Sequence, residues 1–426
     1  MNSKAYSARS VNHIQLGSFL KGRDGQACWV GVDIGKFEIQ VVLHWKPGDF
    51  ERPWRIANPT DIALLSDYFK QLAVGRSLIV ALEPSGTYGD GLRQACHDAG
   101  IMVHRVHPKI AHDYAEVFDG VPSQHDGKDA AVIAELARLG KSSVWAWEIA
   151  PEAQRQIHYW VDRLDTQRRL LGMWTGRIEA LLARHWPEAQ RFKRTSPTLL
   201  HALVEYGGPA ALGADADAEQ KLVRWSRRHF DPPAIRQIIT EAKHSAGVRQ
   251  QPIDLLCMRD HATAALEAKE QMKRARIQLI GHSRDIKPIG ALTPVVGNAT
   301  ACLLFVYLGD PSNYHCAAAY VKAMGLNLTE RSSGTYKGKL RISKRGSSAV
   351  RYWMYLAAMR RVKKTSPVRP WYLRKKHKDS EEGARALVAI MRRLGLALYH
   401  VAALGEAFDA KRLFPGKRKA QNKIKA

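Results

Sequence analysis

Four acidic residues in the first third of the 426-residue chain have the types and the spacing of a metal-binding site. Asp33 and Glu83 each end an apolar run, and Asp126 and Asp129 stand three apart at the start of a helical pattern. Residues three apart share one face of a helix. Gathered carboxylates repel one another unless a cation binds between them, and oxygen ligands of this kind favour Mg²⁺ or Mn²⁺. We therefore predict that these four residues bind metal.

A carboxylate-bound metal site of this kind suits phosphodiester chemistry. Two divalent ions about 4 Å apart can hold a phosphodiester, one activating the attacking oxygen and one stabilising the leaving oxygen. Each acid also has an ordinary structural explanation. Asp33 could belong to a turn, Asp126 could cap a helix, and Asp129 could favour the helix dipole. The four acids together indicate a metal site more strongly than any one of them does.

A second candidate is the serine pair Ser332–Ser333, which precedes Gly334. A Ser-Gly sequence in a loop is most often a turn, but the small residues here leave a hydroxyl accessible. Serine is a weak nucleophile that needs a base or a metal to activate it. Either hydroxyl of this pair is a candidate nucleophile, and the spacing alone does not separate Ser332 from Ser333. The nearby cations taken as nucleic-acid contacts are Lys337, Lys339, Arg341, Lys344, Arg345 and Arg351.

The charge of the chain points to a polyanionic partner. The net charge is +26, from 66 Lys and Arg against 40 Asp and Glu. Residues 331–378 contain sixteen Lys and Arg and no acid, and six Tyr and Trp are interleaved with them. Aromatic residues in such a run can be core residues, or they can stack on bases beside phosphate-binding cations. The pattern predicts binding to nucleic acid.

Composition also bears on the cellular location. No apolar run of about 18 residues exists to span a membrane, so no membrane partner is expected. Five scattered cysteines without a C-x-x-C spacing indicate reduced thiols and argue against a zinc site. No apolar signal segment precedes Cys28. We expect a cytoplasmic protein.

The elements that must position the four acids follow from periodicity. Alternating and apolar runs predict strands and helices in the order of an RNase H-like α/β domain. The predicted strands are 28–33, 37–43, 52–57, 77–82 and 101–106, and the predicted helices are 60–74, 89–99, 109–118 and 126–139.

The middle of the chain has a heptad pattern. Ile157, Leu164, Leu171 and Ile178 recur every seven residues, and so do Trp160, Gln167, Trp174 and Leu181. This pattern predicts a long helix that packs against a partner helix. A weaker seam from Met258 to Leu279 could supply an antiparallel partner, and homodimerisation through the seam is the alternative.

The last part of the chain is predicted to be mainly helical. Residues 294–301 resemble a helix-hairpin-helix turn, although Val295 occupies one of the two usual glycine positions. The predicted organisation is a flexible extension at 1–25, the α/β domain at 26–145, a coiled-coil region at 150–285 with a helical insertion at 197–250, a C-terminal domain at 288–408, and a basic tail at 409–426.

These motifs together resemble the insertion-sequence-110 transposases, which include the Piv-type DNA invertases. In the N-terminal half the matching segments are 32–36, 83–88 and 126–130, and in the C-terminal half they are 294–301, 331–334 and 341–346. They span residues 30–140 and 290–360 in the order of the family. The insertion and the terminal extensions depart from the compact family members.

The resemblance implies a fold and a mechanism. It implies a RuvC-like domain with Asp33, Glu83, Asp126 and Asp129 as metal ligands, and a transposase domain in which Ser333 forms a phosphoserine link to DNA. It also implies guidance by a structured bridge RNA that pairs with donor and target DNA. Finally, it implies dimers that pair into a homotetramer with sites shared between protomers, in a bacterial cytoplasm at the nucleoid.

Three other readings compete with a serine-dependent recombinase. The first is a RuvC-like nuclease without serine chemistry. The second is an actin-like or sugar-kinase-like ATPase, since those folds also open with a strand, Asp-x-Gly and a hairpin, but no second glycine-rich phosphate loop is found. The third is a nucleic-acid-binding protein with an inactive nuclease fold, against which the intact carboxylate set argues.

Overall fold

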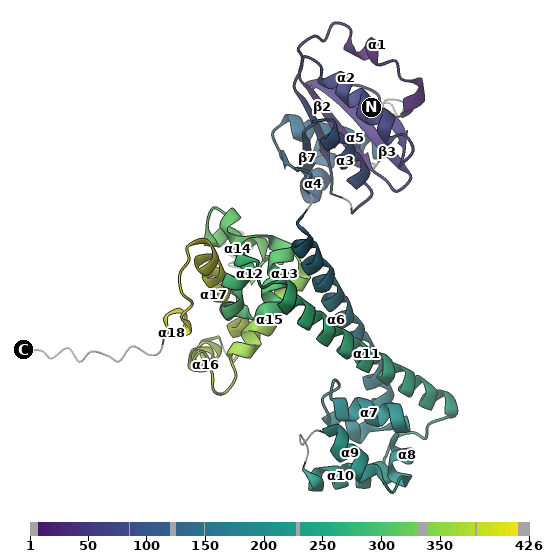
Figure 1. The fold of residues 1–426 in the computed structure, drawn as a ribbon, viewed down its shortest axis with the longest axis vertical. Helices are drawn as coiled ribbons and strands as arrows, with labels where there is room; N and C mark the ends of the chain where they lie inside the picture. Colours follow the sequence, from purple (N-terminus) through teal and green to yellow (C-terminus); the bar gives the residue numbers. More distant parts are fainter. Residues whose placement is uncertain are drawn as a thin grey trace, which may run out of the picture. The chain divides into compact units, whose positions relative to one another are not determined.

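The computed structural model divides into two compact units, Met1–Ile149 (unit 1) and Ala150–Ala426 (unit 2) (Figure 1). Each unit is described by itself. The structure describes residues 7–84, 86–119, 125–148, 150–226, 231–330, 340–379 and 381–415.

Unit 1 is built on a mixed sheet. The strands lie in the order β1-β5-β3-β2-β6-β7-β8, with β4 paired to β3. The first three long strands are antiparallel neighbours, whereas β6 and β7 run parallel to β2. The bounds are β1 Arg9–Ser10, β2 Cys28–Ile34, β3 Glu38–Lys46, β4 Asp49–Phe50, β5 Trp54–Ala57, β6 Leu78–Leu82, β7 Val103–Val106 and β8 Ser142–Val144.

Helices cover both faces of this sheet. On one face, α2 (Ile62–Ala73) and α3 (Asp90–Asp98) pack on alternate strand residues such as Val30 and Val32. On the other face, α4 (Pro108–Asp119) and α5 (Asp126–Arg138) pack on Ala81 and its neighbours. A mixed sheet between helices confirms the α/β prediction for this part of the chain.

The first residues of unit 1 correct the predicted flexible extension. Residues 9–10 pair with β5, and they are followed by η2 (Val11–His13) and α1 (Leu16–Leu20). Val11 and Leu16 are buried in the core of unit 1. Residues 1–25 are polar on average, which led to the prediction of a flexible segment. The few apolar residues among them are sufficient to hold residues 9–20 against the rest of unit 1.

Unit 2 contains two long helices that pack antiparallel. They are α6 (Glu152–His185) and α11 (Pro252–His282). The start of α6 shares a core with the end of α11, and the end of α6 shares a second core with the start of α11. The buried face of α11 is rich in alanine, which lets the two helices approach closely.

The buried face of α6 differs from the predicted seam by one residue. Ile157, Leu164 and Ile178 are buried as expected, and Leu171 is half-buried. The other buried positions of this stretch are Val161, Asp165, Thr175 and Leu182. The predicted positions, Trp160, Gln167, Trp174 and Leu181, are half-buried. The indole of Trp174 instead lies beside His261, with ring centroids 5.3 Å apart. Bulky tryptophans fit the edge of this interface better than its alanine-lined centre.

Short helices between α6 and α11 form a small helical lobe. Their core surrounds Leu200, Leu203 and Ile235 and includes residues of both long helices. The elements are η3 Pro187–Arg191, α7 Pro197–Tyr206, α8 Pro209–Ala214, α9 Ala218–Ser226 and α10 Pro232–Lys243.

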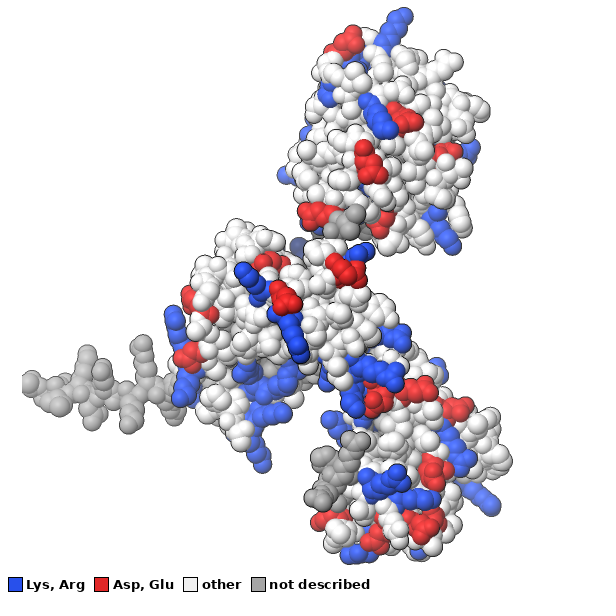
Figure 2. All heavy atoms as spheres, in the orientation of Figure 1, with Lys and Arg blue, Asp and Glu red and all other residues white. Residues whose placement is uncertain are grey.

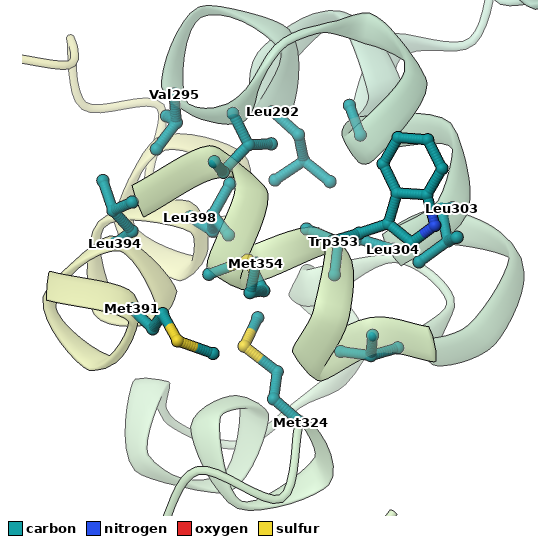
Figure 3. Packing of buried hydrophobic residues seen from close by; sticks show 14 of the residues in the cluster. Leu292, Val295, Leu303, Leu304, Met324, Trp353, Met354, Met391, Leu394 and Leu398 are labelled. Atoms are coloured by element: carbon teal, nitrogen blue, oxygen red, sulfur yellow. The ribbon is translucent and has the colours of Figure 1, made fainter. Parts of the chain in front are cut away.

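The C-terminal helices pack around α15 and α17 (Figure 3). In this core Met354 of α15 lies on the side of Met391, Leu394 and Leu398 of α17, whereas Trp353 lies on the side of Leu303 and Leu304. The elements are α12 Lys287–Val296, α13 Asn298–Leu308, η4 Pro311–Asn313, α14 Ala317–Ala323, β9 Leu328–Thr329, β10 Arg341–Ile342, α15 Ser348–Arg361, α16 Arg369–Lys378, α17 Gly383–Ala403 and α18 Ala410–Leu413.

The start of the predicted basic tail, 409–426, forms the short helix α18 (Ala410–Leu413) and packs against the rest of unit 2. Phe414 is buried, and its ring lies 5.3 Å from that of Trp371. Residues 416–426 lie outside the described part of the chain.

One described helix, α17, is long and apolar enough to cross a membrane by length and composition. Its residues Leu387, Ile390, Leu394 and Leu398 are buried in the core of unit 2. Its apolar character therefore has a use within this unit.

Candidate metal centre and nucleic-acid interface

The sheet register places Asp33 and Glu83 side by side. Val32 of β2 pairs with Leu82 of the parallel strand β6, so Asp33 and Glu83 are the next residues of adjacent strands. Side chains alternate between the two faces of a strand. Val32 and Leu82 face α2 and α3, so both acids face the side of the sheet that α5 covers.

The close packing of α5 on this sheet face depends on Gly31. A Cβ atom at Gly31 would lie 1.9 Å from the carbonyl oxygen of Ala130 and 2.4 Å from the amide nitrogen of Ala134. Only glycine allows β2 and α5 to come this close. Because Gly31 is two residues before Asp33, this contact also brings Asp126 and Asp129, in the first turn of α5, toward Asp33.

A buried ion pair supports the start of α5. The Lys128 ammonium lies 2.7 Å from the Asp119 carboxylate, and both side chains are almost fully buried. Asp119 is the last residue of α4, so the pair links the end of α4 to the first turn of α5. Neither Gly31 nor Lys128 was identified as functional from the sequence, since a glycine in a strand and a lysine beside two acids carry no distinctive signal.

The pKa values of Asp33, Glu83 and Asp129 are raised, in each case partly by the charge of at least one other acid of the set. Burial raises the pKa of Asp33 to about 6, and the three other acids, Asp129 first among them, add to the shift. Burial also raises the pKa of Glu83, with a further contribution from Asp129. The pKa of Asp129 is raised by burial and by Asp126, against the opposing charge of Lys128. The structure therefore brings together all four predicted acids in one electrostatic cluster.

The donor set fits a hard divalent cation by its chemistry. Clustered carboxylates with raised pKa values gain most from a cation that neutralises their mutual repulsion. Across the described residues, however, no group of three or more His, Cys, Asp or Glu lies close enough to hold an ion. The four acids thus lie on the same side of the sheet, but their carboxylates are too far apart in this structure to bind one ion together.

The predicted serines, Ser332 and Ser333, lie outside the described residues, as do Lys337 and Lys339. The short strands β9 and β10 flank residues 331–339, and Arg341 pairs with Thr329 at this position.

The other predicted nucleic-acid contacts fall into two groups. Arg341, Lys344 and Arg345 are exposed. Arg351 is half-buried, and its guanidinium donates to the carbonyl oxygen of Gly346 at 2.8 Å. Arg351 therefore supports the turn that precedes α15, whereas the other three are available to a partner.

The helix-hairpin-helix-like segment forms a tight helix junction. Gly297, at a φ of +84°, joins α12 to α13, and Pro294 lies in the last turn of α12. The Arg361 guanidinium donates to the Pro294 carbonyl oxygen at 2.6 Å, and that of Arg360 donates to the Val296 carbonyl oxygen at 2.7 Å. Two arginines thus stabilise the end of α12.

Cations gather over the part of unit 2 that contains α15 and α16 (Figure 2). The last turn of α16 carries Lys375, Lys376, His377 and Lys378, and none of the residues of this helix is buried. Of the interleaved aromatics, Trp353 is a core residue, while Tyr352 and Tyr355 are exposed. The basic run is therefore partly core and partly an open cationic surface.

Comparison with known proteins defines the class of this chain. Residues 30–187 match the family model of the DEDD transposase of IS110, and residues 292–373 match the model described as "Transposase IS116/IS110/IS902 family". The chain is 24% identical over 364 residues to the insertion element IS110 uncharacterized 43.6 kDa protein of Streptomyces coelicolor, covering 83% of this chain and 89% of the relative. It is also 24% identical over 378 residues to the insertion element IS116 uncharacterized 44.8 kDa protein of Streptomyces clavuligerus, covering 86% of this chain and 92% of the relative.

Both matched regions belong to transposases, enzymes that cut and rejoin DNA. The chain belongs to the IS110 family of transposases, and the resemblance identified from its motifs is confirmed. Its substrate is accordingly DNA, and its DEDD domain calls for a divalent metal.

Proposed function

We propose that this transposase cleaves and exchanges DNA strands with a RuvC-like carboxylate site in unit 1 and a serine nucleophile in unit 2. One observation carries the proposal. Asp33, near the end of β2, and Glu83, directly after the adjacent parallel strand β6, lie on the sheet face covered by α5, the helix that begins with Asp126. The strand order supports an RNase H-like fold, since three antiparallel strands precede two parallel ones.

The four carboxylates would hold Mg²⁺ or Mn²⁺. Such ions supply positive charge that stabilises the phosphodiester as its bonds change. Residues of unit 1 would bind these ions and hold the ligands in position. Asp33, with its raised pKa, must lose its proton before it can act as a ligand. Lys128 and Asp119 hold the first turn of α5, and Gly31 sets its distance from β2.

Ser333 is proposed as the nucleophile on the strength of the family motif, and Ser332 stays the alternative. In the proposed step a bond forms between the serine Oγ and phosphorus while one phosphorus–oxygen bond of the DNA breaks. The serine proton passes to a base, and the departing DNA oxygen takes up a proton. The phosphodiester is conserved as a phosphoserine link, so a free DNA hydroxyl can reverse the step and rejoin strands without ATP.

The proposed partners are donor and target DNA, a structured bridge RNA, and further copies of the chain in a homodimer that pairs into a homotetramer. The exposed cations Arg341, Lys344 and Arg345 support contact with nucleic acid. Guidance by RNA, the assembly, the absence of a membrane partner and a cytoplasmic location at the nucleoid rest on the family resemblance and composition.

The nucleophile can be tested by trapping the covalent intermediate. The full-length protein is incubated with Mg²⁺, DNA carrying the ends of its own element, and the noncoding RNA that flanks the open reading frame. We expect a protein–DNA adduct that survives denaturation, that Ser333→Ala abolishes, and that Ser332→Ala retains. Loss of the adduct in Ser332→Ala alone would make Ser332 the nucleophile. Cleavage without any adduct would favour a RuvC-like nuclease that lacks serine chemistry.

The carboxylate site is tested separately. Asp126→Asn keeps the shape of the side chain but removes its charge, and we expect strand cleavage to fall by at least about 10²-fold, in the range that loss of an electrostatic catalytic group produces. Asp98→Asn, an acid outside the proposed site at the end of α3, is the matched control. Full recombination by Asp126→Asn would contradict the site. The ATPase alternative loses its support, because the chain matches transposases in both units.

A further inference from the structure

We propose that the rings of Phe37 and Tyr88 form a base-stacking subsite for the DNA strand on which unit 1 acts, and that Asn58 holds the two loops of this subsite together. By base-stacking subsite we mean a surface on which an unstacked nucleobase next to the reacting phosphodiester lies against an aromatic ring. The inference rests on the proposed function in one respect, namely that the carboxylates of unit 1 act on DNA.

The two rings are unusually open to solvent. Phe37 is 72% exposed and Tyr88 is 50% exposed. In the part of unit 1 that the structure describes, they are the two exposed side chains among Phe, Tyr and Trp. A single exposed aromatic residue is common on protein surfaces. Here both lie on loops that directly follow the carboxylate-bearing strands, Phe37 after β2 and Tyr88 after β6.

Asn58 ties these two loops to each other. Its side-chain amide donates to the carbonyl oxygen of Gly35 at 2.9 Å and to that of Tyr88 at 3.3 Å. Its backbone amide donates to the carbonyl oxygen of Phe37 at 2.9 Å. Asn58 is itself 9% exposed, so these bonds are largely shielded from water. The loop after Asp33 and the loop after Glu83 are thus held as one structure.

The chemistry of the loops suits a nucleic-acid strand. The Lys36 ammonium lies 4.8 Å from the centroid of the Phe37 ring, so a cation and an aromatic face are presented together. Aromatic rings beside cations bind single strands by stacking on bases and pairing with phosphates, with little dependence on sequence. An unpaired base that stacks on such a ring would hold the adjoining part of its strand in place beside the carboxylates. A DNA strand whose phosphate reaches the carboxylates would pass beside these loops.

Photocrosslinking tests the contact directly. The full-length Asp33→Asn protein is bound in Ca²⁺ to the DNA of its own element, with 5-iododeoxyuridine placed at each position around the cut in turn. Because iodouridine crosslinks efficiently to stacked aromatic side chains, we expect peptides that contain Phe37 or Tyr88 to be linked at one or two positions next to the cut. No catalysis is needed, so failure of this experiment is distinct from failure of the proposed strand chemistry.

Affinity measurements complete the test. Phe37→Ala and Tyr88→Ala should each weaken DNA binding by about tenfold, the effect of losing one stacked base. Phe37→Trp should keep the affinity, because a ring is still present. Val74→Ala removes a side chain that is 73% exposed elsewhere on unit 1, and it should change nothing. Asn58→Ala should weaken binding and spread the crosslinks over more positions.

Three results would overturn the proposal. The first is the absence of crosslinks at both rings together with affinities within about twofold of the parent. The second is equal weakening by Phe37→Trp, which would indicate a purely structural role. The third is crosslinking of these rings to iodouridine in an RNA strand but not in DNA, which would assign the surface to the RNA.

Discussion

At the scale of single residues, Asp33 responds most to its surroundings in the carboxylate cluster. It is half-buried at the end of β2, and burial with three nearby acids raises its pKa to about 6. In the unfolded chain an aspartate ionises near pH 3.9. Between these two values the folded chain binds more protons than the unfolded chain. The metal-free protein therefore loses stability through Asp33 as the pH rises through this window.

A divalent cation should reverse this trend. At about pH 7.5, Mn²⁺ at 100 times its dissociation constant should stabilise unit 1 by about 2.7 kcal/mol. At about pH 5 the same ion should stabilise it much less, because Asp33 is then largely protonated and ligands must be deprotonated. Hydrogen exchange of peptides from β2, β6 and α5, with and without Mn²⁺ at each pH, measures the difference.

The comparison with and without the ion at one pH cancels other titrations, including that of His44, whose pKa burial lowers to about 4. Asp33→Asn should lose most of the gain from Mn²⁺ at the higher pH. Equal protection by Mn²⁺ at both pH values would contradict the assignment of Asp33 as a ligand.

At the scale of elements, the contact between β2 and α5 determines whether the acids meet. A methyl group at Gly31 would collide with the backbone of α5 at 1.9 Å. Backbone atoms cannot move aside as the end of a flexible side chain can, so α5 must shift away from the sheet. The same shift would carry Asp126 and Asp129 away from Asp33.

We expect Gly31→Ala to destabilise unit 1 by about 1–3 kcal/mol or more, as overpacking does. It should also abolish the stabilisation by Mn²⁺, which a general loss of stability would not do. Gly17→Ala is the matched control, because a Cβ there meets open space within a helix and should be neutral or stabilising. Thermal unfolding with and without Mn²⁺ measures both effects. An unchanged response to Mn²⁺ in Gly31→Ala would show that the contact does not position the acids.

At the scale of the whole molecule, the net charge of +26 favours a polyanion as partner. The cations do not all play the same part. Some are held in ion pairs, such as Lys375 with Asp379 at 2.7 Å. Others, including Arg341, Lys344 and Arg345, are exposed and follow in sequence within about twelve residues of the proposed nucleophile.

The salt dependence of DNA binding separates these roles. Removing one phosphate contact lowers the slope of log K against log salt by about 0.9. We expect Arg341→Ala, Lys344→Ala and Arg345→Ala each to have this effect with little change in stability. Arg351→Ala should instead destabilise the turn at Gly346, whose carbonyl oxygen its guanidinium binds, and should change the slope less. Fluorescence anisotropy over a salt series measures the slopes, and equal slopes for all four variants and the parent would contradict the assignment.

The sequence by itself was sufficient for the main elements and the family, and it singled out the four acids, whose role as metal ligands stays a prediction. Asp33 and Glu83 follow apolar runs that are strands, and Asp126 begins a helix, because strand and helix periodicities are local properties of the chain. The extreme charge was likewise visible in composition. The serine assignment was made from the same motifs, and it stays a prediction.

Only the tertiary structure decided which residues meet across elements. The Gly31 contact with α5, the Lys128–Asp119 pair and the bonds of Asn58 join segments that periodicity treats separately. Which face of α6 is buried also depends on the partner helix. Because the facing side of α11 is rich in alanine and packs closely, the bulky Trp160 and Trp174 are only half-buried. Burial and closeness are properties of two surfaces at once, and a single segment carries information about only one of them.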